Sequence, residues 1–348
     1  MSDHTGSIVA DPKDPFEEEL VSWIRNDSLH LILLATERCN FRCTYCYEDF
    51  AIGRMSAETI EGVKRLIDRR VESLDSLSIS WFGGEPLLAR SVVEEVSEHV
   101  VCLARERPQL VYSGDMTTNG FLLDTATVER LVHLGIAHYQ VSLDGPEPLH
   151  NRTRIQRNEK GSFAQIWANL LAIRDGSTPA NVLLRVHLTP DNLPVMPDFL
   201  LCIRETFLND GRFRVLLKPV ERLGGPNDAM MEVVPQETRP GILARLESIL
   251  VDGKEGTKGL FSAPDVCYAS RPNSFVIRAD GRIGKCTVAL RDPANTIGKL
   301  LPDGSFELDN DRLRPWLRGW ASRDWETIGC PYATFPRTRQ EEPAPEFL

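Results

Sequence analysis

Three of the eight cysteines of this 348-residue chain lie within eight residues of one another, in the stretch ATERCNFRCTYCYED at residues 35–49. They are Cys39, Cys43 and Cys46, spaced as Cys-x3-Cys-x2-Cys. Closely spaced thiolates on a short loop hold iron–sulfur clusters, and three of them leave one iron of a four-iron cluster open to another ligand. A structural zinc site normally takes four ligands, and no fourth cysteine or histidine is near in the sequence. The spacing therefore favours a cluster over zinc or three unrelated thiols.

The composition is that of a globular protein in a reducing compartment. The chain is 42% hydrophobic and 26% charged, with a formal net charge of −10. It has no apolar run near the ~18 residues of a membrane-spanning helix and no basic, apolar secretory start. We therefore expect a cytoplasmic protein whose clustered cysteines are ligands or catalytic groups rather than disulfides. Because no basic run is present, we expect neither a nucleic-acid nor a membrane partner.

Strand-like and helix-like segments alternate along most of the chain. Six strand–helix pairs in succession predict a parallel sheet with right-handed crossovers. Six pairs are too few for a closed eight-stranded barrel, so an open partial barrel or a doubly wound sheet fits. The predicted strands span residues 29–36, 76–82, 110–118, 138–144, 181–189 and 212–220. The predicted helices span residues 56–72, 91–107, 125–135, 162–176, 195–208 and 239–253.

Short polar motifs follow the predicted strands. The cysteine loop follows the first strand, GGEP (83–86) the second, TTNG (117–120) the third and SLDG (142–145) the fourth. In barrels of parallel strands, the active site gathers at the carboxyl ends of the strands. The four motifs are therefore expected to meet in one site.

The motifs CNFRCTYC, GGEP and SLDG together resemble those of the radical S-adenosylmethionine (radical SAM) superfamily, over about residues 29–253. The resemblance implies an α/β fold, a partial (β/α)6 barrel. It also implies that Cys39, Cys43 and Cys46 ligate three irons of a 4Fe-4S cluster, and that SAM chelates the fourth. An electron from the reduced cluster would then split SAM into methionine and a 5′-deoxyadenosyl radical, which removes a hydrogen atom from a C–H bond.

The resemblance further implies a set of SAM contacts. Tyr45 matches an aromatic position near the adenine, and Glu85 matches an acceptor for the SAM ammonium group. Asn119 is either a turn residue or a SAM contact, and loop capping is the alternative for Ser142 and Arg154. No side chain is assigned a catalytic role. The predicted cofactor-binding residues are Tyr45, Gly83, Gly84, Glu85, Asn119, Ser142 and Arg154.

A second group of cysteines lies near the C-terminus. NSFVIRADGRIGKCTVAL (273–290) predicts a β-hairpin turning at Asp280-Gly281, and a helix is predicted over 311–325. Cys267, Cys286 and Cys330 accompany this segment and resemble a truncated SPASM or twitch extension, which implies one auxiliary iron–sulfur cluster. Free thiols in a degenerate extension are the alternative. The predicted divisions are a lead-in (1–28), the barrel (29–253), the auxiliary-cluster domain (260–335) and a disordered tail (336–348).

The same resemblance predicts the function. We expect a radical SAM enzyme that matures a ribosomally synthesised precursor peptide, most often by a thioether or carbon–carbon crosslink. Peptide epimerisation, sulfatase maturation, small-molecule chemistry and a non-catalytic cluster-binding scaffold are the alternatives. The expected partners are the precursor peptide, a separate leader-binding protein and a flavodoxin or ferredoxin-type electron donor. Cys102 and Cys202 lie within predicted helices and are expected to be buried structural thiols.

Overall fold

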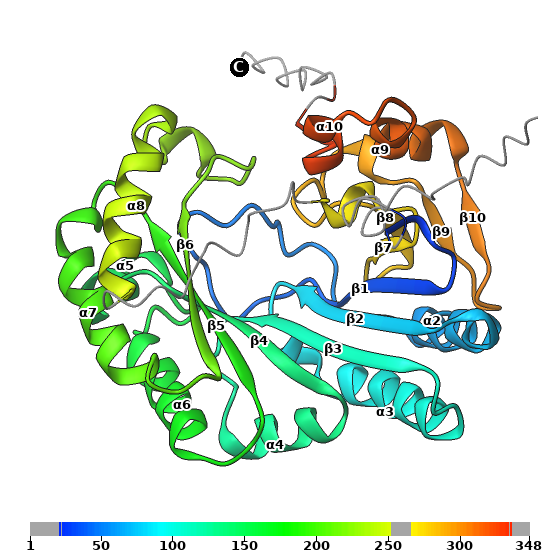
Figure 1. Ribbon diagram of the computed structural model, residues 1–348, viewed down its shortest axis with the longest axis horizontal. Helices are drawn as coiled ribbons and strands as arrows, with labels where there is room; N and C mark the ends of the chain where they lie inside the picture. The colour runs from blue at the N-terminus through cyan, green and yellow to red at the C-terminus, as the bar shows by residue number, and fades with distance from the viewer. Residues whose placement is uncertain (1–20, 22, 252–265, 334, 336–348) are drawn as a thin grey trace, which may run out of the picture.

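A single ten-stranded sheet runs through the computed structural model, which describes residues 21, 23–251, 266–333 and 335. The strand order is β10-β9-β8-β7-β1-β2-β3-β4-β5-β6. Figure 1 shows strands β1 to β6 fanning out from the centre of the molecule, with β7 to β10 on the other side of β1. Strands β6 and β10 are the two edges, so the sheet of the described residues is an open partial barrel, as predicted.

Six parallel strands form the barrel part of this sheet. Each pairs with the next one along the chain, from Ser28↔Ser76 between the first two to Leu188↔Pro219 between the last two. Burial alternates strictly along β2, because one face of the strand lies under helices and the other lines the barrel interior. The strands are β1 Ser28–Thr36, β2 Ser76–Gly83, β3 Val111–Thr118, β4 Ile136–Leu143, β5 Asn181–Leu188 and β6 Phe213–Pro219.

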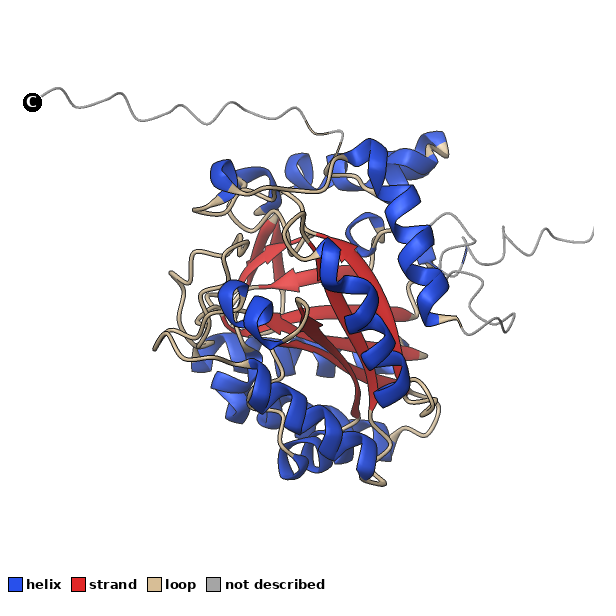
Figure 2. Cartoon of the chain, turned by 90° about the vertical axis from the view of Figure 1, so that its left-hand side faces the viewer, coloured by secondary structure: helices blue, strands red, loops and turns tan. Residues whose placement is uncertain are grey.

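Helices cover the outer face of the curved sheet, as the turned view in Figure 2 shows. Ser56 caps the first of them by accepting from the amide of Thr59, which confirms the predicted helix start. A short helix after β4 was not predicted, and it begins directly after Pro146. The helices are α2 Ala57–Arg70, α3 Arg90–Glu106, α4 Thr125–His133, α5 Glu147–Thr153, α6 Phe163–Asp175, α7 Met196–Phe207 and α8 Arg239–Leu250.

The C-terminal segment continues the same sheet. The predicted hairpin is present, with Gly281 at its turn in the left-handed region (φ 83°). Its first strand pairs in parallel with β1, so the extension shares the barrel's hydrogen-bonded ladder. Two further strands of three residues each were too short to be seen in the sequence pattern. The strands are β7 Ser274–Ile277, β8 Arg282–Gly284, β9 Gly298–Leu300 and β10 Phe306–Leu308.

The single helix predicted over 311–325 is two helices in the structure, α9 (Asn310–Ser322) and α10 (Trp325–Gly329). The chain breaks because Arg323 takes a left-handed conformation and Asp324 caps the second helix through the amide of Glu326. Trp316 and Trp320 dock α9 onto the extension, and their indole N–H groups donate to the carbonyls of Ala294 and Ser270.

The expectation that Cys102 and Cys202 are buried is wrong, because both thiols are exposed. The buried face of α3 runs through Val92, Val96 and Val100. Cys102 lies off this stripe, and Cys202 is likewise off the buried face of α7.

Several predictions fall on parts of the chain that the structure does not describe. Most of the lead-in, most of the glycine-rich break after α8 and the C-terminal tail lie outside the described residues. Among the helices that are described, none is long and apolar enough to cross a membrane.

Candidate active site

A cavity of about 230 Å³ opens at the carboxyl ends of the barrel strands. It brings together the four motifs that follow the first four strands, as the sequence predicted. It is also walled by the end of β6 and by Thr287 and Val288 of the C-terminal extension. The predicted residues that line it are Cys39, Cys43, Tyr45, Cys46, Gly83, Gly84, Asn119, Ser142 and Arg154.

The cysteine loop is held by backbone hydrogen bonds rather than by the three thiols. The amide of Arg42 donates to Ile155 O (2.6 Å), and the amide of Arg157 donates to Asn40 O (2.7 Å), so the segment after α5 forms one side of the loop. Cys39 Sγ accepts from the amide of Phe41 (3.3 Å). The loop is therefore preorganised, with the sulfurs free of any disulfide.

The donor set fits an iron–sulfur cluster better than a single ion. Burial raises the pKa of the Cys39 and Cys43 thiols and raises that of Cys46 to about 12. These groups therefore become thiolates only when a metal supplies positive charge. Among the described residues, no three His, Cys, Asp or Glu side chains converge on one ion position. A four-iron cluster does not need such convergence, because each thiolate binds a different iron.

The two glycines of GGEP allow the end of β2 to pass directly beneath the cysteine loop. A Cβ at Gly83, where φ is 115°, would lie 2.3 Å from the carbonyl oxygen of Thr36. A Cβ at Gly84 would lie 2.5 Å from the carbonyl oxygen of Arg38. Both positions line the cavity, but the atoms that exclude a side chain belong to the last residue of β1 and to the cysteine loop.

Glu85 is fully buried behind the cavity wall and does not line it. Its carboxylate accepts from the amide of Asn119 (2.7 Å) and the hydroxyl of Thr118 (2.9 Å), and it also accepts from the amide of Leu87. Burial raises the pKa of this carboxyl group, and the hydrogen bonds act in the opposite direction. Glu85 thus ties the end of β2 to the end of β3.

Asn119 is a turn residue that also contacts the cysteine loop. Its side-chain oxygen accepts from the amide of Phe121 (3.0 Å), which makes it a turn residue. Its side-chain nitrogen donates to Asn40 (2.8 Å) and lies 4.0 Å from Cys39 Sγ, and the residue lines the cavity. The turn after β3 is therefore fastened to the cysteine loop.

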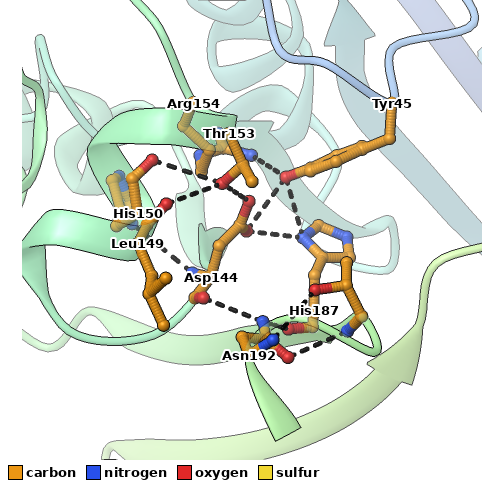
Figure 3. Close-up of polar contacts among 9 residues, drawn as sticks. Tyr45, Asp144, Leu149, His150, Thr153, Arg154, His187 and Asn192 are labelled. Atoms are coloured by element: carbon orange, nitrogen blue, oxygen red, sulfur yellow. Dashed lines mark hydrogen bonds and ion pairs between the residues drawn. The ribbon is translucent and has the colours of Figure 1, made fainter. Parts of the chain in front are cut away.

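Tyr45 and Arg154 belong to a buried polar network that Figure 3 shows. The Tyr45 hydroxyl donates to Asp144 Oδ1 (2.9 Å), accepts from Arg154 Nη1 (2.8 Å) and lies 3.1 Å from His187 Nδ1. Thr153 donates its hydroxyl proton to the other oxygen of Asp144 (2.6 Å). The network links the cysteine loop, the end of β4, the segment after α5 and the end of β5.

The charges in this network are set by burial and by the neighbouring groups. Burial by itself would raise the pKa of Asp144, but the hydrogen bond with His187 and the charge of Arg154 outweigh it and hold that pKa well below its usual range. Burial lowers the pKa of His187, and Asp144 only partly offsets this effect. The network therefore joins one carboxylate and one guanidinium through the Tyr45 hydroxyl, and a neutral imidazole lies within hydrogen-bond distance of both that hydroxyl and the carboxylate.

Sequence reasoning missed several residues of the site. Asp144 stands inside the quoted motif SLDG, but the motif does not show which side chain points inward. The sequence pattern assigned no role to His187, yet it lines the cavity, and so does Arg185 two positions earlier on β5. Side chains two positions apart on a strand point to the same face of the sheet, and this alternation could have indicated that both residues face the barrel interior.

Arg185 and Glu48 each keep a buried polar atom without a hydrogen-bond partner. These atoms are Arg185 Nε and Glu48 Oε2, and both residues line the cavity. Burial raises the pKa of Glu48 to about 8, and the nearby charge of Glu37 acts in the same direction. Lys218, the other cation of the β5–β6 side, is engaged with Glu221 at 2.6 Å. The cavity therefore holds a guanidinium cation whose charge is not matched by an ion pair within the described residues.

The structure brings the three C-terminal cysteines into one neighbourhood from three separate segments. Burial raises the pKa of the Cys267 thiol, and the nearby Cys286 and Cys330 raise it further. The amide of Cys267 donates to Ile328 O (3.1 Å), which fastens the first segment to α10. Cys286 directly precedes Thr287 and Val288, which line the barrel cavity. The second cysteine group therefore adjoins the wall of the cavity that contains the first.

Comparison with known protein families identifies the class. Residues 33–199 match the family model described as the Radical SAM superfamily. The enzymes of this superfamily use a 4Fe-4S cluster and SAM as cofactors.

Several curated relatives of this chain are named as GTP 3′,8-cyclases. The relative from Mycobacterium sp. (strain KMS) is 25% identical over 309 residues, which cover 83% of this chain and 82% of that protein. The relative from Streptomyces coelicolor is 29% identical over 273 residues, covering 74% and 77%. The GTP 3′,8-cyclase 2 of Mycobacterium tuberculosis is 32% identical over 179 residues, covering 50% and 47%.

Solved structures support the fold alone. The structure of native anSMEcpe with bound AdoMet and Cp18Cys peptide is 19% identical and covers 82% of this chain and 80% of that one, with a TM-score of 0.62. The structure of Streptococcus suis SuiB bound to precursor peptide SuiA is 16% identical and covers 92% and 75%, with a TM-score of 0.57.

The prediction of a peptide-maturing function is wrong, since the curated relatives are named for a cyclase that acts on GTP. The first cysteine loop, GGEP and SLDG lie where the cluster and SAM are expected to bind, so they indicate the shared chemistry and not the substrate. The peptide epimerase and sulfatase-maturase alternatives fall for the same reason. The match of residues 33–199 to an enzyme superfamily argues against the scaffold alternative.

Proposed function

We propose that this radical SAM enzyme acts on a purine nucleoside triphosphate, with GTP as the first candidate, in the manner of the cyclases that it resembles. One observation carries the proposal: a single cavity is lined both by Cys39, Cys43 and Cys46 and by Arg185, whose guanidinium has no ion pair among the described residues. A guanidinium group matches phosphate oxygens in geometry and charge. The names of the curated relatives supply the rest of the support.

In this proposal the three cysteines of the first loop hold the cluster. When bound and reduced, the cluster gives one electron to SAM, which yields methionine and the 5′-deoxyadenosyl radical of this enzyme class. The chain's own residues bind SAM, exclude water and fix the position of the substrate. The proposed SAM contacts that line the cavity are Tyr45, Gly83, Gly84, Asn119, Ser142 and Arg154.

We assign Glu85 a positioning role toward SAM. Its carboxylate fixes the amide of Asn119 and the hydroxyl of Thr118 from behind the wall. Tyr45 is likewise positioned, because its hydroxyl is shared by Asp144, His187 and Arg154. This arrangement leaves little freedom to the tyrosine ring, which borders the space where the resemblance predicts the adenine.

The C-terminal cysteines are proposed to hold one auxiliary iron–sulfur cluster in a twitch-like extension. Support comes from the gathering of Cys267, Cys286 and Cys330 and from the position of Thr287 and Val288 in the cavity wall. A substrate in the cavity would then lie between the two cysteine groups. Three thiolates leave one iron of a four-iron cluster open, so the substrate is a candidate for the remaining ligand.

Anaerobic incubation with SAM, dithionite and GTP tests the function. We expect the formation of 5′-deoxyadenosine together with the loss of GTP, both measured by liquid chromatography with mass detection. Replacing GTP by UTP should leave only slow, uncoupled cleavage of SAM. If 5′-deoxyadenosine forms while GTP stays intact, the radical chemistry is retained and the nucleotide assignment is wrong.

The role of Arg185 is tested by Arg185→Met, with Arg185→Lys as the matched variant that keeps the charge. A charged hydrogen bond is worth about 1.5–3 kcal/mol, so Arg185→Met should raise the KM for GTP by about ten- to hundredfold. Uncoupled cleavage of SAM should be unchanged, and Arg185→Lys should recover part of the loss. An unchanged KM in Arg185→Met would remove the residue from the substrate site.

A further inference from the structure

A lysine side chain is fully buried in the C-terminal extension, beside the second cysteine group. Lys285 is 0% exposed, and it directly follows β8 and precedes Cys286. Among the described residues, its ammonium group contacts two backbone carbonyls and the ring of Phe275, and it forms no ion pair with a carboxylate. Lysine is almost never fully buried unless its charge is paired, because removing an ammonium group from water is costly. The extension therefore holds a buried cation that needs a counter-charge.

The contacts of the Lys285 side chain hold it against the segment that carries Cys267. Its Nζ donates to the carbonyl oxygens of Arg271 (2.6 Å) and Ser274 (2.5 Å). A single 3-10 turn, Tyr268–Ser270, separates Cys267 from Arg271 along the chain. The ammonium group therefore lies at the end of the turn that begins next to Cys267, where a cation also meets the negative end of the peptide dipoles.

The backbone of Lys285 is fixed together with that of Cys286. The amides of both residues donate to Asn295 Oδ1 at 2.9 Å, and Asn295 Nδ2 donates to Cys286 O (2.8 Å). Burial lowers the pKa of Lys285, and a thiolate at Cys267 acts in the opposite direction, so the two groups lie within electrostatic reach of each other. The buried cation is thus held between the segments of two of the three C-terminal cysteines.

A four-iron cluster bound by thiolates carries a net negative charge, and its reduction adds one more. A buried ammonium group, which salt screens little, lowers the free energy of the more negative state. We propose that Lys285 is the built-in counter-cation of the auxiliary cluster and raises the reduction potential of that cluster. Lys285 has this role only if the auxiliary cluster proposed above is present. The step that it favours is the uptake of one electron by the cluster, in which no covalent bond forms or breaks.

A purely structural role for Lys285 is the competing explanation. Its two hydrogen bonds to carbonyls also tie the end of β8 to the turn after Cys267 and to the first residue of β7. The potential of the cluster responds to the charge of the side chain, whereas the stability of the apoprotein responds to the hydrogen bonds and to packing. The two roles are therefore separated by measuring both quantities in the same variants.

The test is Lys285→Met, which keeps the unbranched side chain and removes its charge. Lys285→Arg is the matched variant that keeps the charge. The control is Lys299→Met, because Lys299 is exposed on the neighbouring strand β9 and its removal changes the net charge by the same amount. The potentials of both clusters are measured in the full-length protein by anaerobic redox titration, followed by electron paramagnetic resonance. Urea denaturation of the apoprotein gives the stability of each variant.

We expect Lys285→Met to lower the equilibrium constant for one-electron reduction of the auxiliary cluster about tenfold, which corresponds to about 59 mV in potential. The potential of the first cluster, and its change on adding SAM, should stay as in the wild type. Lys285→Arg should keep most of the auxiliary potential, and Lys299→Met should match the wild type because water and salt screen an exposed charge. Loss of the auxiliary signal to an iron chelator should be about tenfold faster in Lys285→Met alone.

Three outcomes would overturn the role of Lys285. The first is an unchanged auxiliary potential in Lys285→Met. The second is loss of the auxiliary cluster in both Lys285→Met and Lys285→Arg with a matching loss of apoprotein stability, which would make the residue a structural clamp. Loss in Lys285→Met alone, with the cluster kept in Lys285→Arg, would instead support the need for the charge. The third is wild-type protein that binds only about four irons per chain, and this result would refute the auxiliary cluster itself rather than its tuning.

Discussion

The two cysteine groups are built in opposite ways. Cys39, Cys43 and Cys46 come from one short loop after β1, and backbone hydrogen bonds hold that loop in shape. Cys267, Cys286 and Cys330 come from three segments, one before β7, one after β8 and one after α10. The first group is therefore a local property of the sequence, whereas the second exists only when the extension has folded. We therefore expect the first cysteine site to survive damage to the extension, and the second site to be lost when the extension does not fold.

The largest expected effect follows from removing the first group. The triple variant with Ala at Cys39, Cys43 and Cys46 should lose cleavage of SAM to the limit of detection, because no electron donor remains beside the sulfonium. Iron content and 5′-deoxyadenosine formation under dithionite measure this. Cleavage of SAM that survives in the triple variant would refute the assignment.

Removing the second group should give a different result. With Ala at Cys267, Cys286 and Cys330, iron should fall from about eight to about four per chain, since one of two four-iron clusters is lost. Uncoupled cleavage of SAM should persist while conversion of the substrate is lost. The electron paramagnetic resonance signal of the first cluster, and its change on adding SAM, provides the control. Wild-type protein that binds only about four irons would show that the second site is not a cluster.

The contrast also explains how far the sequence could lead. The six strand–helix pairs were predictable because each shows a hydrophobic period over contiguous residues. The first cysteine loop was predictable because its three cysteines lie within eight residues of one another. Strands β9 and β10 are three residues long and carry no such pattern. The inward direction of Arg185 and His187 depends on strand register, and the substrate class could not be read from motifs that bind the shared cofactors.

A buried ion pair joins the two regions and offers a third test. Glu37, two residues before Cys39, accepts from Arg278 Nε (3.0 Å) and Nη2 (2.5 Å), and Arg278 also donates to Leu290 O. Both side chains are under a tenth exposed. Arg278→Ala leaves a buried carboxylate without its partner, which typically costs about 3–5 kcal/mol of unfolding free energy.

Chemical denaturation of the apoprotein measures this loss, and Arg282→Ala on the same hairpin is the control. Arg282 pairs with Asp280 at a surface where both side chains are more than a third exposed, so its removal should cost at most about 1 kcal/mol. The double variant with Glu37→Gln should recover part of the loss, since the charge left behind is then removed. Equal costs for the two arginines would show that the buried pair does not couple the regions.

The smallest expected effect concerns pH and the seam between barrel and extension. His30 on β1 bonds Ser80 on β2 through Nε2 and Ser274 on β7 through Nδ1, each at 2.9 Å. Burial first, and then the charges of Arg271 and Lys285, lower the pKa of His30 from 6.5 to about 4. The unfolded chain therefore binds the extra proton between these two pH values, so stability is fully present above pH 6.5 and falls as the pH drops toward 4. The shift corresponds to at most about 3 kcal/mol.

His30→Gln should flatten the dependence of the unfolding free energy on pH between 7 and 4.5, measured by urea denaturation at each pH. The matched control is His133→Gln, which removes an exposed histidine in the last turn of α4. If the unfolding free energy of His30→Gln depends on pH as steeply as that of the wild type, protonation of His30 is not the cause of the loss of stability in acid.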